Sequence, residues 1–153
     1  MSRIDLFLDS SALFAAVVSP TGAARALLEL AECGVVTITV SEQVVAETER
    51  ALARKVPAAL PAYRQALRAV GLRIGRDPSL ANVLACLDMI SHPADAPILA
   101  AARQSQVDYL VTLNRRHFLD DPAVALRSGL RIGAPGEALK WIREQGLLGE
   151  QGD

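Results

Sequence analysis

Short apolar runs typical of buried strands alternate along the chain with longer stretches in which apolar residues recur at helical spacing. Strands are predicted at 4–8, 35–40, 109–112 and 130–132, with a further short one at 72–74. The run at 35–40 is rich in Val, Ile and Thr, the residue types that favour strands. This alternation predicts βα units and a mostly parallel sheet, which places the chain in the α/β class.

The helical pattern covers 23–32, 42–56, 62–70, 80–90 and 96–104, and a last helix is predicted to begin at Pro135. Ser41 and Asp95 stand where helix N-caps are expected. Pro57 and Pro61 interrupt the middle of the chain, so 42–56 and 62–70 are predicted to form a helical-hairpin clamp that projects from the sheet. Trp141 is expected to pack on the sheet.

A length of 153 residues is enough for one core and too short for two independent enzymatic domains. We expect one domain over 1–145 and a flexible tail over 146–153. The chain is 51% hydrophobic, yet no apolar run reaches the roughly 18–20 residues of a membrane helix, so a cytoplasmic protein with no membrane partner is predicted. Cys33 and Cys86 lie in apolar helical stretches without metal-ligand spacing and are expected to be buried, reduced thiols.

The net charge is −1, but the charges are unevenly distributed. The segment from Arg50 to Arg76 contains seven basic residues and no acid. This basic window suits the phosphate backbone of a nucleic acid, and it equally suits two solvated helix faces. Both interpretations remain open from the charge pattern alone.

Three carboxylates stand beside apolar segments. Asp9 follows the strand at 4–8, Glu47 lies among apolar residues of the helix at 42–56, and Asp95 precedes the helix at 96–104. In a parallel sheet such positions come together at one edge, where clustered acids bind a hard cation. Asp9 and Asp95 also suit helix caps. Glu47, if buried, requires a metal or an Arg beside it.

These acids occur in the segments 8–11, 45–47 and 95–102, which are followed by Val107 to Phe118. In this order and at these separations the segments resemble the PIN domain family, particularly its bacterial toxin-like branch. The resemblance implies a three-layer α/β/α sandwich and a Mg²⁺- or Mn²⁺-dependent ribonuclease that cleaves RNA. It further implies the toxin of a type II toxin-antitoxin pair with a cognate antitoxin protein, and a homodimer. Asp9, Glu47 and Asp95 match the family's acidic metal-binding positions.

One position departs from the family pattern. A fourth acid often follows the Thr of the penultimate strand, and here that position is Asn114. An amide oxygen binds a metal but brings no negative charge. A catalytically degenerate RNA-binding module is therefore the alternative function. Among the acids near Asn114 in sequence, Asp108 is predicted to be a turn residue, and Asp120 and Asp121 to lie in a loop or helix cap.

The remaining polar residues complete the predicted site. Ser10 and Thr112 are expected to position water or phosphate, and Arg115 and Arg116, with Arg50 and Arg54 of the basic window, to contact RNA. His92 and His117 have no recognisable partner and are expected to be surface or core histidines. The chain has neither a nucleophile elbow nor a Gly-rich phosphate loop, which disfavours a serine hydrolase and a Rossmann-like nucleotide binder.

Overall fold

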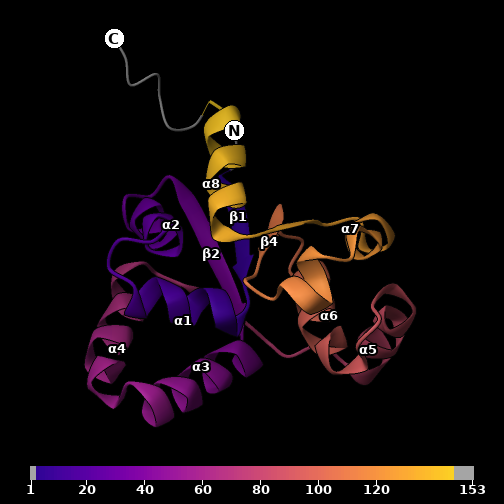
Figure 1. Ribbon diagram of the computed structural model, residues 1–153, viewed down its shortest axis with the longest axis horizontal. Coiled ribbons are helices and arrows are strands. Elements are labelled where there is room, and N and C mark those ends of the chain that lie inside the picture. Colours follow the sequence, from indigo (N-terminus) through magenta and orange to yellow (C-terminus); the bar gives the residue numbers. More distant parts are fainter. Residues whose placement is uncertain (1–2, 147–153) are drawn as a thin grey trace.

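The computed structural model describes residues 3–146, so the predicted tail at 146–153 lies outside the described residues except for Gly146. Five strands form one parallel sheet in the order β3-β2-β1-β4-β5, with helices on both sides, as the sequence predicts (Figure 1). The strands are β1 (Ile4–Leu8), β2 (Val36–Ser41), β3 (Arg73–Gly75), β4 (Tyr109–Val111) and β5 (Arg131–Gly133).

Eight α-helices lie within the described residues. They are α1 (Ser10–Val18), α2 (Ala23–Glu32), α3 (Glu42–Lys55), α4 (Leu60–Ala69), α5 (Leu80–Cys86), α6 (Ala96–Gln104), α7 (Pro122–Ser128) and α8 (Pro135–Glu144). Short 3₁₀ turns span Pro57–Ala59, Leu87–Met89 and Pro93–Asp95, and one turn of π-helix spans Arg115–Leu119. Figure 1 shows α1 to α4 on one side of the sheet and α5 to α7 on the other.

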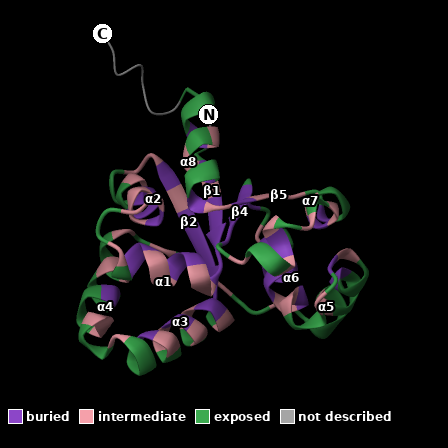
Figure 2. Ribbon diagram, in the orientation of Figure 1, coloured by how far each residue is buried: buried purple, intermediate pink, exposed green. Residues whose placement is uncertain are grey.

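The core lies where the central strands meet the helices. Figure 2 shows β1, β2 and β4 buried, whereas the outer faces of α3 and α4 are exposed. Leu6, Phe7 and Leu8 of β1 are fully enclosed, because β1 is paired on both edges and covered on both faces. Trp141 in α8 packs its indole on Tyr109 of β4, as predicted, with ring centroids 5.4 Å apart.

The helical hairpin is formed by α3 and α4, and its turn follows from Pro57. A residue that precedes proline is held away from helical angles, and Val56 has φ −144° and ψ 65°. Ser41 caps α3 as predicted, since its hydroxyl accepts a hydrogen bond from the Val44 amide at 3.2 Å. Pro61 lies in the first turn of α4, where its missing N–H has no effect.

The structure differs from the prediction at the end of α5 and at the start of α6. The helix predicted at 80–90 ends at Cys86 and continues as the 3₁₀ turn Leu87–Met89. Asp95 does not cap α6, because the chain enters this helix through the turn Pro93–Asp95 and Asp95 already has helical angles, φ −94° and ψ −5°. Its carboxylate bonds none of the first-turn amides, so it is available for another contact.

Candidate active site

Asp9 lies at the carboxyl end of β1, beside the point where the chain connections diverge to β2 on one side and β4 on the other. Ligands of open α/β proteins bind at such a point. Asp9 is 6% exposed and caps α1, since its Oδ1 accepts hydrogen bonds from the Ala12 amide at 2.9 Å and the Ser11 hydroxyl at 2.6 Å. Burial raises the pKa of Asp9, against the lowering effect of these hydrogen bonds.

Thr112 supplies the contact that holds the other oxygen of Asp9. Its hydroxyl donates to Asp9 Oδ2 and accepts from the Asn114 amide at 3.0 Å. Thr112 is fully buried, and its hydroxyl is engaged by Asp9 and the Asn114 amide. Its side chain faces the β1 acid because β4 pairs directly with β1 and ends beside it.

Glu47 projects from α3 toward the same sheet edge. Its Oε2 accepts from the Ser10 hydroxyl at 3.0 Å and its Oε1 from the Gln43 amide group at 2.8 Å. Both donors are neutral, and no Arg or Lys within residues 3–146 forms an ion pair with Glu47. Of the two partners expected for Glu47, a metal or an Arg, the described residues supply no Arg.

Asp95 lies at the start of α6, and its Oδ2 contacts Nδ1 of His117. The His117 ring stacks on His92, with centroids 3.6 Å apart and planes at 19°. Each histidine therefore has a partner that was not recognisable in the sequence. Sequence reasoning missed the pair because His117 and Asp95 are distant along the chain and belong to different elements.

Asn114 follows β4 and caps the π-helix Arg115–Leu119. Its Oδ1 accepts a hydrogen bond from the His117 amide at 3.1 Å. A carbonyl oxygen has a second lone pair, so this bond leaves Asn114 able to bind a cation or water.

One cavity of about 320 Å³ is lined by the three acids and Asn114. Its polar lining consists of Asp9, Ser10, Ser11, Gln43, Glu47, Asp95 and Asn114. Among the described residues no Lys or Arg lines it, so its three carboxylates attract cations. They are not all close enough to bind one ion directly, since no group of three or more His, Cys, Asp or Glu within residues 3–146 has that arrangement. The oxygen-only donor set fits a divalent cation that keeps several of its waters.

The family model described as PIN domain matches residues 5–116, the segment that supplies Asp9, Glu47, Asp95 and Asn114. The chain belongs to the PIN domain family. PIN domains are generally nucleases that use divalent metal ions, which agrees with the acidic cavity.

Two solved structures share the fold of this PIN domain. One is PAE2754 from Pyrobaculum aerophilum, with a TM-score of 0.60, 19% sequence identity, and matches over 93% of this chain and 91% of that chain. The other is VapBC2 from Rickettsia felis bound to a DNA fragment from their promoter, with a TM-score of 0.61, 19% identity, and matches over 86% and 98%. The curated proteins include no significant match.

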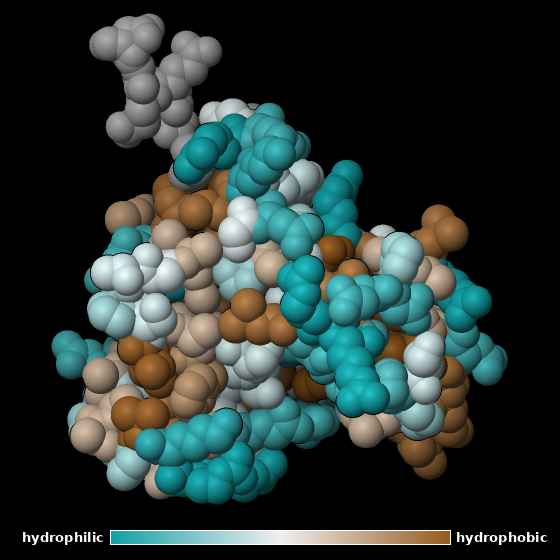
Figure 3. Space-filling model, in the orientation of Figure 1, coloured by the Kyte–Doolittle hydropathy of each residue, from teal (hydrophilic) through white to brown (hydrophobic). Residues whose placement is uncertain are grey.

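None of the four arginines predicted to contact RNA lines the cavity. Arg50 and Arg54 are exposed on α3, where Figure 3 shows a band of hydrophilic side chains. Arg115 and Arg116 are exposed on the π-helix that follows β4, and Arg115 lies 3.9 Å from Asp120. These positions leave all four guanidinium groups accessible to a polyanion.

Gln43 and Ser11 also belong to the site of the PIN domain, although the sequence analysis did not select them. Each has a local signal that could have found it. Gln43 precedes Glu47 by one helical turn, the spacing at which side chains meet, and Ser11 follows Asp9 within its capping turn.

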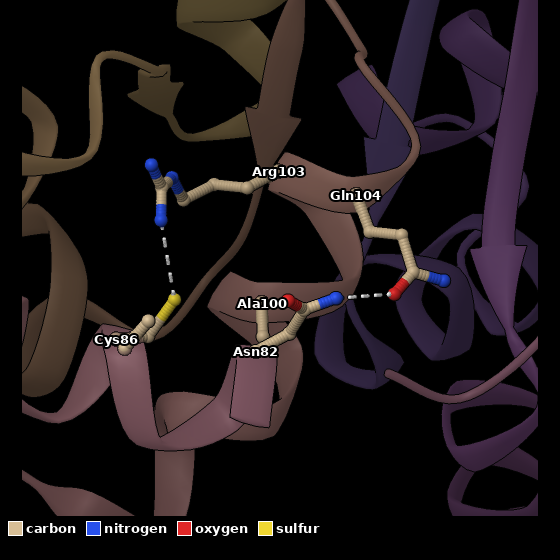
Figure 4. Close-up of a pocket in the computed structure, with 6 residues that line it drawn as sticks. Asn82, Cys86, Ala100, Arg103 and Gln104 are labelled. Atoms are coloured by element: carbon tan, nitrogen blue, oxygen red, sulfur yellow. Dashed lines mark hydrogen bonds between the residues drawn. The ribbon is translucent and has the colours of Figure 1, made fainter. Parts of the chain in front are cut away.

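A second cavity of about 230 Å³ lies between α5 and α6 (Figure 4). Here Asn82 donates to Gln104 at 3.1 Å and Arg103 approaches the Cys86 sulfur at 3.7 Å. Its lining contains no carboxylate among the described residues, so it lacks the chemistry of a cation site.

Cys86 is buried as predicted, but Cys33 is exposed, and its predicted burial is wrong.

Asp120 is exposed beside Arg115 and, like Asp108 and Asp121, does not line the cavity. Asp108 accepts a hydrogen bond from the Asp5 amide at 2.8 Å at the amino end of the sheet, and Asp121 caps α7 through the Ala123 amide at 3.2 Å. Neither replaces the missing fourth acid.

Within residues 3–146 no single helix has the length and apolar character to cross a membrane, although α1 and α2, bent by 87°, meet the length and composition test as a pair.

Proposed function

We propose that this PIN domain is a metal-dependent endoribonuclease that hydrolyses RNA phosphodiester bonds in the acidic cavity. The observation that carries the proposal is the convergence of Asp9, Glu47, Asp95 and Asn114 on one cavity without a cationic side chain among the described residues that line it. The negative charge of such a site repels a phosphate until a bound cation neutralises that charge. A nuclease with this site therefore requires a metal ion.

Asp9, Asp95 and Asn114 would hold Mg²⁺ or Mn²⁺, with Glu47 binding directly or through water. The bound ion supplies Lewis acidity, which lowers the pKa of a water and offsets charge on the phosphate oxygens. The arrangement favours partial ligation through water, because the described acids are not grouped for three direct contacts. One ion is expected, since the amide of Asn114 brings no charge for a second.

The protein's own residues then orient the reactants. Ser10 and Gln43 fix both oxygens of Glu47, which leaves this carboxylate in place to accept a proton from the attacking water. The water oxygen forms a bond to phosphorus while the bond from phosphorus to the 3′-oxygen breaks. The 3′-oxygen takes up a proton, so the products are a 5′-phosphate and a 3′-hydroxyl.

The substrate is expected to enter across the exposed arginines. Arg50 and Arg54 on the hairpin clamp and Arg115 and Arg116 beyond β4 would contact backbone phosphates on two sides of the cavity. Contacts of this kind set affinity without reading the base sequence, so RNA binding should weaken as salt rises.

We further propose that the protein is the cytoplasmic toxin of a type II toxin-antitoxin pair. Support comes from the fold shared with VapBC2, whose description names a complex on promoter DNA. An antitoxin segment that places an Arg in the cavity would compensate the charge of Glu47 and occupy the metal site. An antitoxin gene beside this one, and a stable complex of the two products, are the expected findings.

A homodimer is also proposed, formed through α5. Leu80, Leu84 and Leu87 are 73%, 53% and 37% exposed at helical spacing, and Leu126 of α7 is 85% exposed nearby. Figure 3 shows apolar side chains over α5 and α7. No charged residue lies between Leu80 and Leu87, so two copies can pair this face around a twofold axis without like-charge repulsion. Light scattering should give a dimer for the wild type and a monomer for Leu84→Glu.

Cleavage of a mixed RNA pool by purified protein, in Mg²⁺, in Mn²⁺ and in EDTA, tests the nuclease proposal. Asp95→Asn and Glu47→Gln should abolish cleavage, and Asp88→Asn, which changes an exposed acid outside the cavity, is the matched control. Metal-independent cleavage, or full activity in both cavity variants, would refute the proposal.

The alternative function, a catalytically degenerate RNA-binding module, is favoured specifically by Asn114. It predicts salt-sensitive RNA binding by wild type and cavity variants alike, with no cleavage in any metal. The same RNA pool separates the two functions, because binding and cleavage are measured on one sample.

A further inference from the structure

We propose that His117 is a positioning residue that holds one oxygen of Asp95 so that the other is presented to the cation. This inference rests on the proposed metal-dependent function and identifies a group outside the direct ligands on which metal affinity depends. It is drawn from the contact between the His117 imidazole and the Asp95 carboxylate.

The contact between Asp95 and His117 is exclusive. Asp95 Oδ2 and His117 Nδ1 are both buried and contact each other, and no other group among the described residues forms a hydrogen bond with either atom. A carboxylate can only accept, so Nδ1 carries the hydrogen. Asp95 nevertheless lines the acidic cavity, which leaves Oδ1 as the oxygen that faces it. Asp95 is therefore expected to bind the ion through one oxygen.

His117 is itself fixed from two directions. Its backbone amide donates to Asn114 Oδ1 at 3.1 Å, and its ring stacks on His92 at 3.6 Å. The carbonyl of His92 in turn accepts from the Asp95 amide at 2.9 Å. His92, His117 and Asp95 thus form a closed set of contacts that favours one orientation of the His117 ring.

This arrangement assigns His117 a role different from acid–base catalysis. The nitrogen that carries the hydrogen is buried against Asp95 and does not reach a reacting atom. Groups that orient a ligating side chain typically change metal affinity 10- to 100-fold when they are removed. A loss of that size is expected for His117→Ala, since Asp95 Oδ2 then has no donor and the carboxylate is free to turn.

Mn²⁺ binding to the purified full-length protein, followed by electron paramagnetic resonance, tests the role without relying on cleavage. His117→Ala should weaken binding about 10- to 100-fold. His117→Asn places an N–H near the position of Nδ1 and should restore affinity to within about threefold of wild type. Arg127→Ala removes an exposed side chain of α7, the helix that packs on this π-helix, and is the matched control outside the cavity. Circular dichroism confirms that each variant is folded.

A second pair of variants tests the stacked ring. His92→Phe keeps an aromatic face against His117 and should bind Mn²⁺ like the wild type, whereas His92→Ala should bind more weakly.

Two outcomes overturn the inference in distinguishable ways. If His117→Ala binds Mn²⁺ as tightly as the wild type, or His117→Asn binds as weakly as His117→Ala, the positioning role is wrong while the proposed function stands. If the wild type binds no Mn²⁺ and cuts no RNA in any metal, the proposed function fails and the positioning role fails with it.

Discussion

Replacement of Thr112 by Val tests whether the buried hydroxyl holds the central acid. Val matches the shape of Thr but removes the donor to Asp9 Oδ2 and the acceptor of the Asn114 amide. Thr112 is the donor that the structure gives to Oδ2, since Ser11 and Ala12 both bond Oδ1. A buried charged oxygen without a donor, together with a lost amide hydrogen bond, is expected to cost about 3 kcal/mol of unfolding free energy.

Thermal unfolding in EDTA measures this cost without metal. A protein of this size loses roughly 2–4 °C of Tm per kcal/mol, so Thr112→Val should melt about 6–12 °C below the wild type. Thr112→Ser keeps the hydroxyl and loses one buried methyl, which costs about 1 kcal/mol. In an Asp9→Asn background the charge is gone, and Thr112→Val should then cost at least about 1 kcal/mol less. Equal Tm values for Thr112→Val and Thr112→Ser would refute the reasoning. An equal cost of Thr112→Val in the wild-type and Asp9→Asn backgrounds would also refute it.

Three other predictions concern single positions away from the cavity. Tyr63→Phe should be as stable as the wild type or more so, because the Tyr63 hydroxyl is buried without a partner. Burial also raises the pKa of Tyr63 to about 12, so the wild type should lose stability relative to this variant as pH rises from about 10 to 12, which alkaline denaturation checks. Gly133→Ala should lower the unfolding free energy by about 1–3 kcal/mol in a urea titration, since the added methyl collides with the Tyr109 side chain; an unchanged midpoint would contradict this. Under native conditions a thiol reagent should modify exposed Cys33 quickly and buried Cys86 only on unfolding, and simultaneous modification would count against the structure.

Local patterns in the sequence predicted much of the fold. The bounds of β1, α2 and α6 agree with the prediction, because each is delimited by a cap, a glycine or a change of apolar period within a few residues. The shift of β2, β3 and β5 by one residue has a different origin. These bounds depend on the register with the neighbouring strand, which is a property of the folded sheet.

The sequence predicted site residues that directly follow a strand. It did not predict contacts between residues that are distant along the chain. Asp9 could be selected because it follows the apolar run of β1. The two serines after it indicate the start of a helix that Asp9 caps. The contact of Asp95 with His117 and the burial of Thr112 depend on how α6 and the π-helix pack against β4. Cys33 was misjudged for the same reason, since apolar neighbours in sequence did not bury it at the end of α2.

The helix α3 carries Glu47, Arg50 and Arg54 on one continuous segment. Each residue turns the helix by about 100°, so one residue deleted between Glu47 and Arg50 would turn both arginines about 100° farther from the side of the acid. An insertion in the turn Pro57–Ala59 would leave that alignment intact. The chain can therefore vary in length at the tip of the hairpin, while the spacing between Glu47 and the two arginines stays fixed by the helix.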